Sequence, residues 1–133
     1  MLRRPFALAA VLSLLAAAGA EARTVTYKRI VSPSKQISCH AVIPVAGGGI
    51  ECSAAYLPDI GELDTYLALR RHGKSILSER GDYSGYTTPR HTLRYGDVWK
   101  RPGIRCTMRT SGLTCRNLDS HGFRIARGAI RRF

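Results

Sequence analysis

Polar and apolar residues alternate with a period of two along most of the chain. This spacing is typical of half-buried β-strands, because successive side chains of a strand point to opposite faces. Beyond the first 22 residues no stripe of apolar residues keeps helical spacing for three turns. The one place for a short helix is residues 58 to 69, where we favour a loop followed by a strand. The predicted strands are Val25–Val31, Gln36–Ile43, Ile50–Tyr56, Thr65–Arg71, Ser75–Glu79, Thr92–Trp99, Ile104–Arg109, Leu113–Asn117 and Phe123–Arg127.

Turn-forming residues separate these short segments, as Ser32-Pro33-Ser34 and Pro102-Gly103 illustrate. Short, evenly spaced strands with turns between them are typical of sandwiches and small barrels. We therefore predict an all-β fold, a single compact barrel or sandwich of about eight or nine short antiparallel strands with two disulfide-bridged hairpins.

The first 22 residues have the layout of a secretion signal. Arg3 and Arg4 precede an apolar run from Phe6 to Ala18, and Ala20-Glu21-Ala22 places small residues where a signal peptidase cleaves. The run of about 13 residues is shorter than the roughly 20 that a bilayer span needs. We expect residues 1–22 to be a signal peptide and residues 23–133 a single secreted β domain, exported to the periplasm or outside the cell, with no transmembrane segment after cleavage.

The four cysteines all lie in the exported part, and an even number in an oxidising compartment favours disulfides. Three pairings are possible. Two of the nearby pairs bracket turns, so we favour Cys39 with Cys52 and Cys106 with Cys115. The spacings contain no C-x-x-C knuckle, which disfavours zinc, and we predict no metal site and no cofactor.

The cysteines also assign the faces of the strands, because a disulfide in a small domain usually points toward the core. Side chains two residues away on the same strand then share the inward face. The inward set is Ile37, Ala41, Ile43, Ile50, Ala54, Tyr56, Ile104, Met108, Leu113, Phe123 and Ile125. The outward face collects four arginines, Arg105, Arg109, Arg116 and Arg124, which are the predicted binding residues.

The charge of the chain is unevenly distributed. Its formal net charge is +12, and removal of the signal leaves 19 basic and 8 acidic side chains. Residues 90 to 133 carry 11 basic residues against only Asp97 and Asp119. Such a field attracts anionic polymers, anionic membrane surfaces and nucleic acid. The alternative is a basic surface that only keeps the protein soluble.

Two short motifs that suggest enzymes do not fit. Gly73-Lys74-Ser75 matches the end of a phosphate-binding loop, but Ala68 stands where that loop needs glycine. Ser32-Pro33-Ser34-Lys35 matches the S-x-x-K of penicillin-binding enzymes, but the partner motifs are absent and the chain is far too short for that fold.

Histidines and aromatic residues offer weaker signals. His121 with Arg124, Arg127 and Glu51 would make an acid–base site for RNA cleavage if the fold assembled them, although His121 lies in a turn sequence that favours a structural role. His40, His72 and His91 have no distinctive spacing. The aromatic residues near the basic region are Tyr83, Tyr86, Tyr95 and Trp99. Such side chains can stack on nucleic-acid bases, but we favour a role in packing within the sheet.

Several segments together match a recurring signature: Val31 to Cys39 with its Ser-Pro-Ser, Glu51-Cys52, Leu93 to Trp99 with its Tyr-Gly-x-x-Trp, Ile104 to Cys106, Gly112 to Asn117, and His121-Gly122-Phe123. With this signature the chain resembles a family of small secreted bacterial proteins whose domain has no assigned function. The resemblance implies a secreted, cysteine-bridged domain and transfers no catalytic residue. Members carry another cysteine pair in the middle, which this chain lacks, so residues 57 to 90 are expected to be built differently.

We therefore expect an extracytoplasmic binding module for an anionic envelope component or polyanion. The first alternative is a small secreted hydrolase acting on RNA or another phosphodiester. The second is a structural envelope protein without a ligand. The residues leave an enzymatic role open and favour binding.

Overall fold

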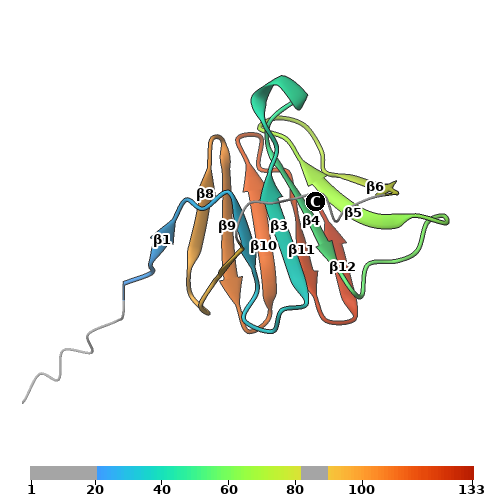
Figure 1. The fold of residues 1–133 in the computed structure, drawn as a ribbon. Helices are drawn as coiled ribbons and strands as arrows, with labels where there is room; N and C mark the ends of the chain where they lie inside the picture. The colour runs from blue at the N-terminus through green and yellow to red at the C-terminus, as the bar shows by residue number, and fades with distance from the viewer. Residues whose placement is uncertain (1–20, 82–89) are drawn as a thin grey trace, which may run out of the picture.

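The computed structural model describes residues 21–81 and 90–133, and within these residues two six-stranded sheets pack face to face as an open sandwich (Figure 1). Sheet A has the order β1-β8-β9-β10-β11-β12, and sheet B the order β6-β5-β4-β3-β2-β7. The strands are β1 (Thr24–Val25), β2 (Arg29–Val31), β3 (Ile37–Ala41), β4 (Ile50–Ala54), β5 (Asp64–Leu69), β6 (Ile76–Arg80), β7 (His91–Thr92), β8 (Val98–Arg101), β9 (Ile104–Arg109), β10 (Gly112–Asn117), β11 (Gly122–Ala126) and β12 (Ala129–Arg132).

The predicted all-β class is confirmed, and of the two predicted architectures the sandwich is correct, not the closed barrel. The described residues form twelve strands instead of eight or nine, because two predicted strands are each divided and β12 was not predicted. Residues 58 to 63 form no helix, and strand β5 follows them, which confirms the loop and strand predicted for this segment.

Both divided segments cross from one sheet to the other. The predicted strand Val25–Val31 becomes β1 in sheet A and β2 in sheet B, and Thr92–Trp99 becomes β7 in sheet B and β8 in sheet A. The first segment crosses from sheet A to sheet B and the second from sheet B to sheet A, and their strands pair in parallel, β1 with β8 and β2 with β7. The prediction of purely antiparallel strands is therefore wrong at these two pairs, where long connections make parallel neighbours possible.

The core lies between the two sheets and is built from their inward faces. Trp99 is completely buried, and its indole N–H donates to the carbonyl of Tyr27 at 2.7 Å, which satisfies its polar atom inside the core. The largest fully buried side chains are Trp99, Phe123, Ile30, Ile50, Leu67, Leu69, Leu93, Leu113 and Ile125.

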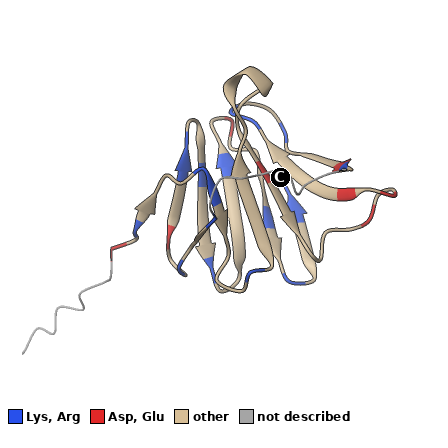
Figure 2. Cartoon of the chain, viewed as in Figure 1, with Lys and Arg blue, Asp and Glu red and all other residues tan. Residues whose placement is uncertain are grey.

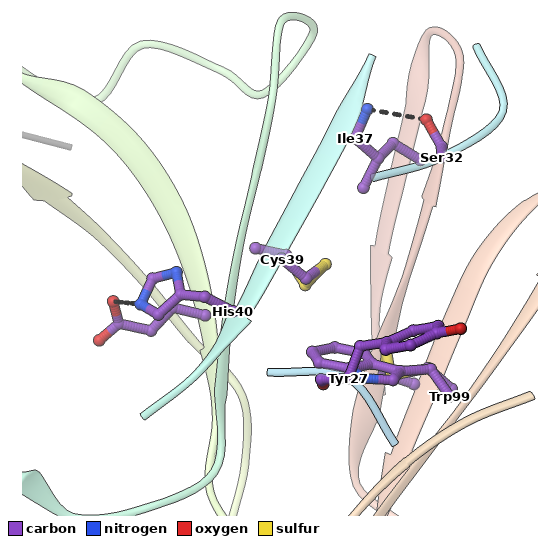
Figure 3. Close-up of a disulfide and its surroundings, with 10 residues drawn as sticks. Tyr27, Ser32, Ile37, Cys39, His40 and Trp99 are labelled. Carbon is purple, nitrogen blue, oxygen red and sulfur yellow. Dashed lines mark hydrogen bonds and ion pairs between the residues drawn. A yellow bond between two sulfur atoms is a disulfide. The ribbon is translucent and has the colours of Figure 1, made fainter. Parts of the chain in front are cut away.

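Both predicted disulfides are confirmed, one in each sheet. Cys39 lies directly opposite Cys52 in the β3–β4 pair, and Cys106 opposite Cys115 in the β9–β10 pair, with Cα–Cα distances of 4.1 and 4.0 Å. All four are buried, and Figure 3 shows Cys39 pointing to the opposite side of β3 from His40.

The inward assignments made from the cysteines hold along the strands and fail at one strand end. Ile43 was assigned to the core but is 62% exposed. Strand β3 ends at Ala41, and a short 3-10 turn over Pro44–Ala46 carries the chain away from the sandwich, so the two-residue alternation no longer applies at Ile43.

Asn117, the last residue of β10, holds one end of the sandwich together, and we call this the closed end. Its side-chain amide donates to the carbonyls of Arg70 and Gly73 at 3.0 and 2.7 Å, which belong to the turn between β5 and β6 in the other sheet. Its side-chain oxygen accepts from the backbone N–H groups of Asp119 and His121. One buried side chain therefore stabilises its own turn and joins the two sheets.

A second contact at the closed end is made by Asp119. Its carboxylate accepts from the backbone N–H of Gly73 at 2.8 Å and lies 3.0 Å from the Nδ1 atom of His72. This pair holds the pKa of Asp119 below its ordinary value, chiefly through the hydrogen bond from His72.

The predicted signal peptide falls almost entirely in residues 1–20, which lie outside the described part of the chain. Within residues 21–81 and 90–133 no helix is long and apolar enough to cross a membrane.

Candidate anion-binding face and end cleft

The outer face of sheet A carries a group of exposed cations, which we call the basic face: Lys100, Arg105, Arg116, Arg124 and Arg131. They come from five strands, β8 to β12, and form two neighbouring cross-strand rows. In the first row Lys100 lies opposite Arg105, and Arg105 opposite Arg116. In the second row Arg124 lies opposite Arg131.

The structure brings three of the four predicted arginines into this face. Arg105, Arg116 and Arg124 point outward, because their neighbours Cys106, Cys115 and Phe123 fill the core. The fourth, Arg109, is also exposed but lies at the end of β9, where the chain turns. Lys100 and Arg131 were not predicted to belong to this face. β8, which carries Lys100, has no cysteine to assign the direction of its side chains, and β12, which carries Arg131, was not predicted as a strand.

No acidic residue occurs in strands β8 to β12, as Figure 2 also shows. Among the described residues no ion pair reaches the basic face. Like charges directly opposite each other in a sheet are destabilising, so the Arg105–Arg116 and Arg124–Arg131 neighbours work against the fold unless a bound anion separates them.

The guanidinium groups are partly held in place by local contacts. Arg124 donates to the carbonyl of Ser111 at 2.9 Å, and the Arg116 guanidinium lies over the ring of Phe133, 4.5 Å from its centre. Together with Thr114 and Arg131 these residues line a shallow hollow of about 300 Å³ on the face. The cations therefore surround a depression with an aromatic wall.

A larger cleft of about 500 Å³ lies at the end of the sandwich opposite the closed end, and we call it the end cleft. Turns and strand ends from both sheets line it. The lining residues are Ser34, Gln36, Ile37, Tyr56, Tyr95, Met108, Arg109, Thr110, Gly112 and Arg127.

The end cleft is cationic and rich in hydrogen-bond donors. Its two basic residues are Arg109 and Arg127, and the described lining contains no Asp, Glu or His. Burial raises the pKa of the Tyr56 phenol, with Arg127 opposing the shift. The Tyr56 hydroxyl is therefore protonated at neutral pH and can donate a hydrogen bond.

The Ser-Pro-Ser sequence forms one wall of the cleft because it makes a tightly bonded turn. The buried Ser32 hydroxyl accepts from the N–H of Ile37 at 3.0 Å, and the Ser32 carbonyl accepts from the N–H of Lys35 at 2.9 Å. Lys35 takes a left-handed backbone with φ of 64°, and its ammonium donates to the hydroxyl of Thr92. This turn presents Ser34 at the cleft.

The Tyr-Gly-x-x-Trp sequence forms the facing wall. Asp97 is buried and accepts from the backbone N–H of Arg94 at 2.7 Å and from the Arg23 guanidinium at 2.5 and 3.1 Å. The hydrogen bond from Arg23 holds the pKa of Asp97 below its ordinary value. The turn that results leaves Tyr95 52% exposed at the cleft.

A different charged cluster lies on the outer face of sheet B. Glu51 accepts two hydrogen bonds from Arg80, at 2.9 and 3.0 Å, and its carboxylate lies 3.2 Å from Nε2 of His40 (Figure 3). His40 and Glu51 are cross-strand neighbours, and both are buried. Burial lowers the pKa of His40. Sequence spacing gave no signal for this cluster, because Arg80 comes from a strand two places away in the sheet.

The acid–base site that His121 would form with Glu51, considered as an alternative to a structural role in a turn, is not assembled. His121 lies in the closed-end turn, where its N–H donates to Asn117, while Glu51 pairs with Arg80 and His40 on sheet B. Of the residues considered for base stacking, Trp99 is buried in the core, Tyr95 is exposed, and Tyr83 and Tyr86 lie outside the described residues.

Over residues 21–81 and 90–133 no three His, Cys, Asp or Glu side chains gather in a way that suits a metal ion. Comparison with family models, with curated proteins and with solved structures finds no match. Function is therefore inferred from the basic face and the end cleft.

Proposed function

We propose that this protein is an extracytoplasmic binding module that holds an anionic polymer on its basic face. One observation carries the proposal: five cations stand in two adjacent rows across five strands, without an acidic side chain in those strands. Neighbouring strands lie about 4.8 Å apart, so the cations form a dense array on one surface. A polymer with repeated phosphate or carboxylate groups supplies the missing counter-charges and releases its own counterions on binding.

The array favours a repeated anion over a single one. Arg105 and Arg116 lie directly opposite each other, and Arg124 and Arg131 do the same in the next row. Arginine presents planar donors that match phosphate and carboxylate oxygens. A polyanion can engage both rows at once, whereas one small anion reaches one pair. The exported location, which supports an envelope polymer as the ligand, is part of the proposal.

The test compares the wild type with Arg105→Ser/Arg116→Ser in binding single-stranded RNA, anionic vesicles and acidic cell-wall polymer at two salt concentrations. We expect wild-type binding to weaken steeply with salt and the double variant to bind at least one of these polyanions more weakly. For a single-stranded nucleic acid each lost phosphate contact should reduce the log–log salt slope by about 0.7.

The matched control is Lys28→Ser/Lys74→Ser, which removes the same net charge from exposed positions outside the basic face. If position matters, this control binds like the wild type. Equal weakening by both double variants would show that only net charge acts. Absence of salt-sensitive binding to all three polyanions would contradict the proposed function.

A further inference from the structure

The end cleft has the size and position of a ligand site separate from the basic face. Its volume of about 500 Å³ falls in the range of about 300–1,000 Å³ that small-molecule sites occupy. Residues at or beside strand ends of both sheets line it: Gln36 before β3 and Tyr56 after β4 adjoin sheet B, whereas Arg109 at the end of β9 and Arg127 between β11 and β12 adjoin sheet A. Such a cleft takes a compact ligand and is too small to enclose a polymer.

Its charges select an anion. Arg109 at the end of β9 and Arg127 in the turn between β11 and β12 both line the cleft, and among the described residues neither takes part in an ion pair. Because the described lining has no carboxylate, nothing there neutralises the two guanidinium groups. Carboxylate and phosphate oxygens are the groups that arginine pairs with most specifically.

The remaining lining suits a ring that carries hydroxyl groups. Tyr56 and Tyr95 offer aromatic surfaces with hydroxyl tips, and Ser34, Gln36 and Thr110 offer further donors and acceptors. Two of the walls are held before any ligand arrives, one by the Ser32 turn and the other by Asp97. Turns that are fixed in advance lose less conformational entropy on binding.

We propose that the end cleft binds a small ring compound bearing a carboxylate or phosphate, of the size of an acidic sugar, with Arg109 and Arg127 holding the anionic group and the two tyrosines contacting the ring. The acid can be a uronate or a sugar phosphate, which share this chemistry. The site does not depend on the basic face.

The variants must separate the cleft from the face. Arg109 and Tyr95 also line a second hollow that includes Arg105 of the basic face, so they report on both regions. Arg127 and Tyr56 line the end cleft and not that hollow. Arg127→Gln and Tyr56→Phe are therefore the cleft variants, and Arg131→Gln is the matched control, because it removes one charge from the basic face.

The experiment titrates the isotopically labelled domain with glucuronate, glucose 6-phosphate and uncharged glucose, and follows the backbone amide signals by NMR. We expect saturable shifts for at least one of the acids at amides around Gln36, Tyr56 and Gly112, and none for glucose. Arg127→Gln should lower the affinity for that acid about tenfold or more, since a charge-assisted hydrogen bond is lost. Tyr56→Phe should lower this affinity severalfold, and Arg131→Gln should leave it unchanged.

Three results would overturn the site: no saturable shifts with either acid at tens of millimolar, equal binding of glucose, or shifts confined to the basic face. Failure of the acidic-sugar site can be distinguished from failure of the proposed polymer binding, because different variants affect the two. Arg127→Gln is expected to keep its affinity for polyanions while losing the acidic sugar, and Arg105→Ser/Arg116→Ser is expected to do the reverse.

Discussion

The two ends of the sandwich use polar residues in opposite ways. At the closed end, Asn117 and Asp119 hydrogen-bond to the backbone of residues 70 to 73 in the other sheet. At the end cleft, Arg109, Arg127 and Tyr95 project from strand ends and turns, and among the described residues no ion pair holds either arginine. The same two sheets are thus joined at one end and separated by a ligand-sized space at the other.

This difference follows from the residues that the turns carry. Short amides and carboxylates reach the backbone nearby and satisfy it, which fixes a turn in one arrangement. Long side chains with charged heads lose more conformational freedom when they are held, and they are well solvated when they are not. A stable sandwich needs one firm junction between its sheets, and the opposite end is then available for binding.

The largest effect is expected from removing the closed-end junction. Asn117→Ala deletes four hydrogen bonds and leaves two carbonyls and two N–H groups of the turns unsatisfied. We expect the free energy of unfolding to fall by about 3 kcal/mol in urea titrations. Gln36→Ala at the exposed edge of the cleft is the control and should change it by less than about 0.5 kcal/mol. Equal losses of unfolding free energy in the two variants would contradict the view that the closed end alone joins the sheets firmly.

The second effect concerns acid sensitivity, since each end contains an aspartate of lowered pKa. Asp97 is buried beside Arg23, whereas Asp119 is exposed beside His72. Because the folded state favours the Asp97 carboxylate, its stabilising contribution is present above about pH 4 and is lost as the pH falls through the lowered pKa. At neutral pH we expect Asp97→Asn to lower the free energy of unfolding by roughly 1 kcal/mol, after solvent screening of the exposed Arg23 is taken into account.

Unfolding curves at several pH values check this prediction. The difference between the wild type and Asp97→Asn should shrink progressively below about pH 4, where the Asp97 carboxylate of the unfolded chain takes up a proton, until the pH passes the lowered pKa of the folded state. Asp119→Asn should show a smaller effect of the same sign. A larger acid dependence from Asp119 would mean that the exposed pair, and not the buried one, governs stability in acid.

A third test asks how firmly the wall of the cleft is built. Ser32→Ala removes the hydroxyl that accepts the N–H of Ile37 in a buried turn. We expect a loss of about 1 kcal/mol, seen as a lower melting temperature by about 5 °C for a domain of this size. Ser34→Ala, whose side chain is exposed at the same turn, is the control and should melt close to the wild type.

The smallest effect is local. Asp119→Asn replaces the carboxylate that accepts the N–H of Gly73 and contacts His72. Hydrogen exchange should become faster at the Gly73 amide while the strand amides of sheet A keep their protection. Unchanged exchange at Gly73 would show that Asn117 alone maintains the closed end.

Much of the fold was predictable because it depends on short-range patterns. Alternation along β9 and β10 placed Cys106 and Cys115 inward and Arg105 and Arg116 outward, and both disulfides join neighbouring strands of one hairpin. The end cleft was not predictable in the same way. Ser34, Tyr56 and Arg127 are far apart in the chain, and the sequence contains no sign that their turns meet.

The sequence by itself determined the strand-forming segments, the direction of their side chains and the pairing of the cysteines, because each depends on residues within one hairpin. The tertiary structure alone decided that residues 25 to 31 and 92 to 99 cross between the sheets, since the alternation continues while the hydrogen-bond partners change. It also decided which end of the sandwich is closed. That choice depends on contacts between segments more than forty residues apart, such as Asn117 with Arg70, which no local pattern encodes.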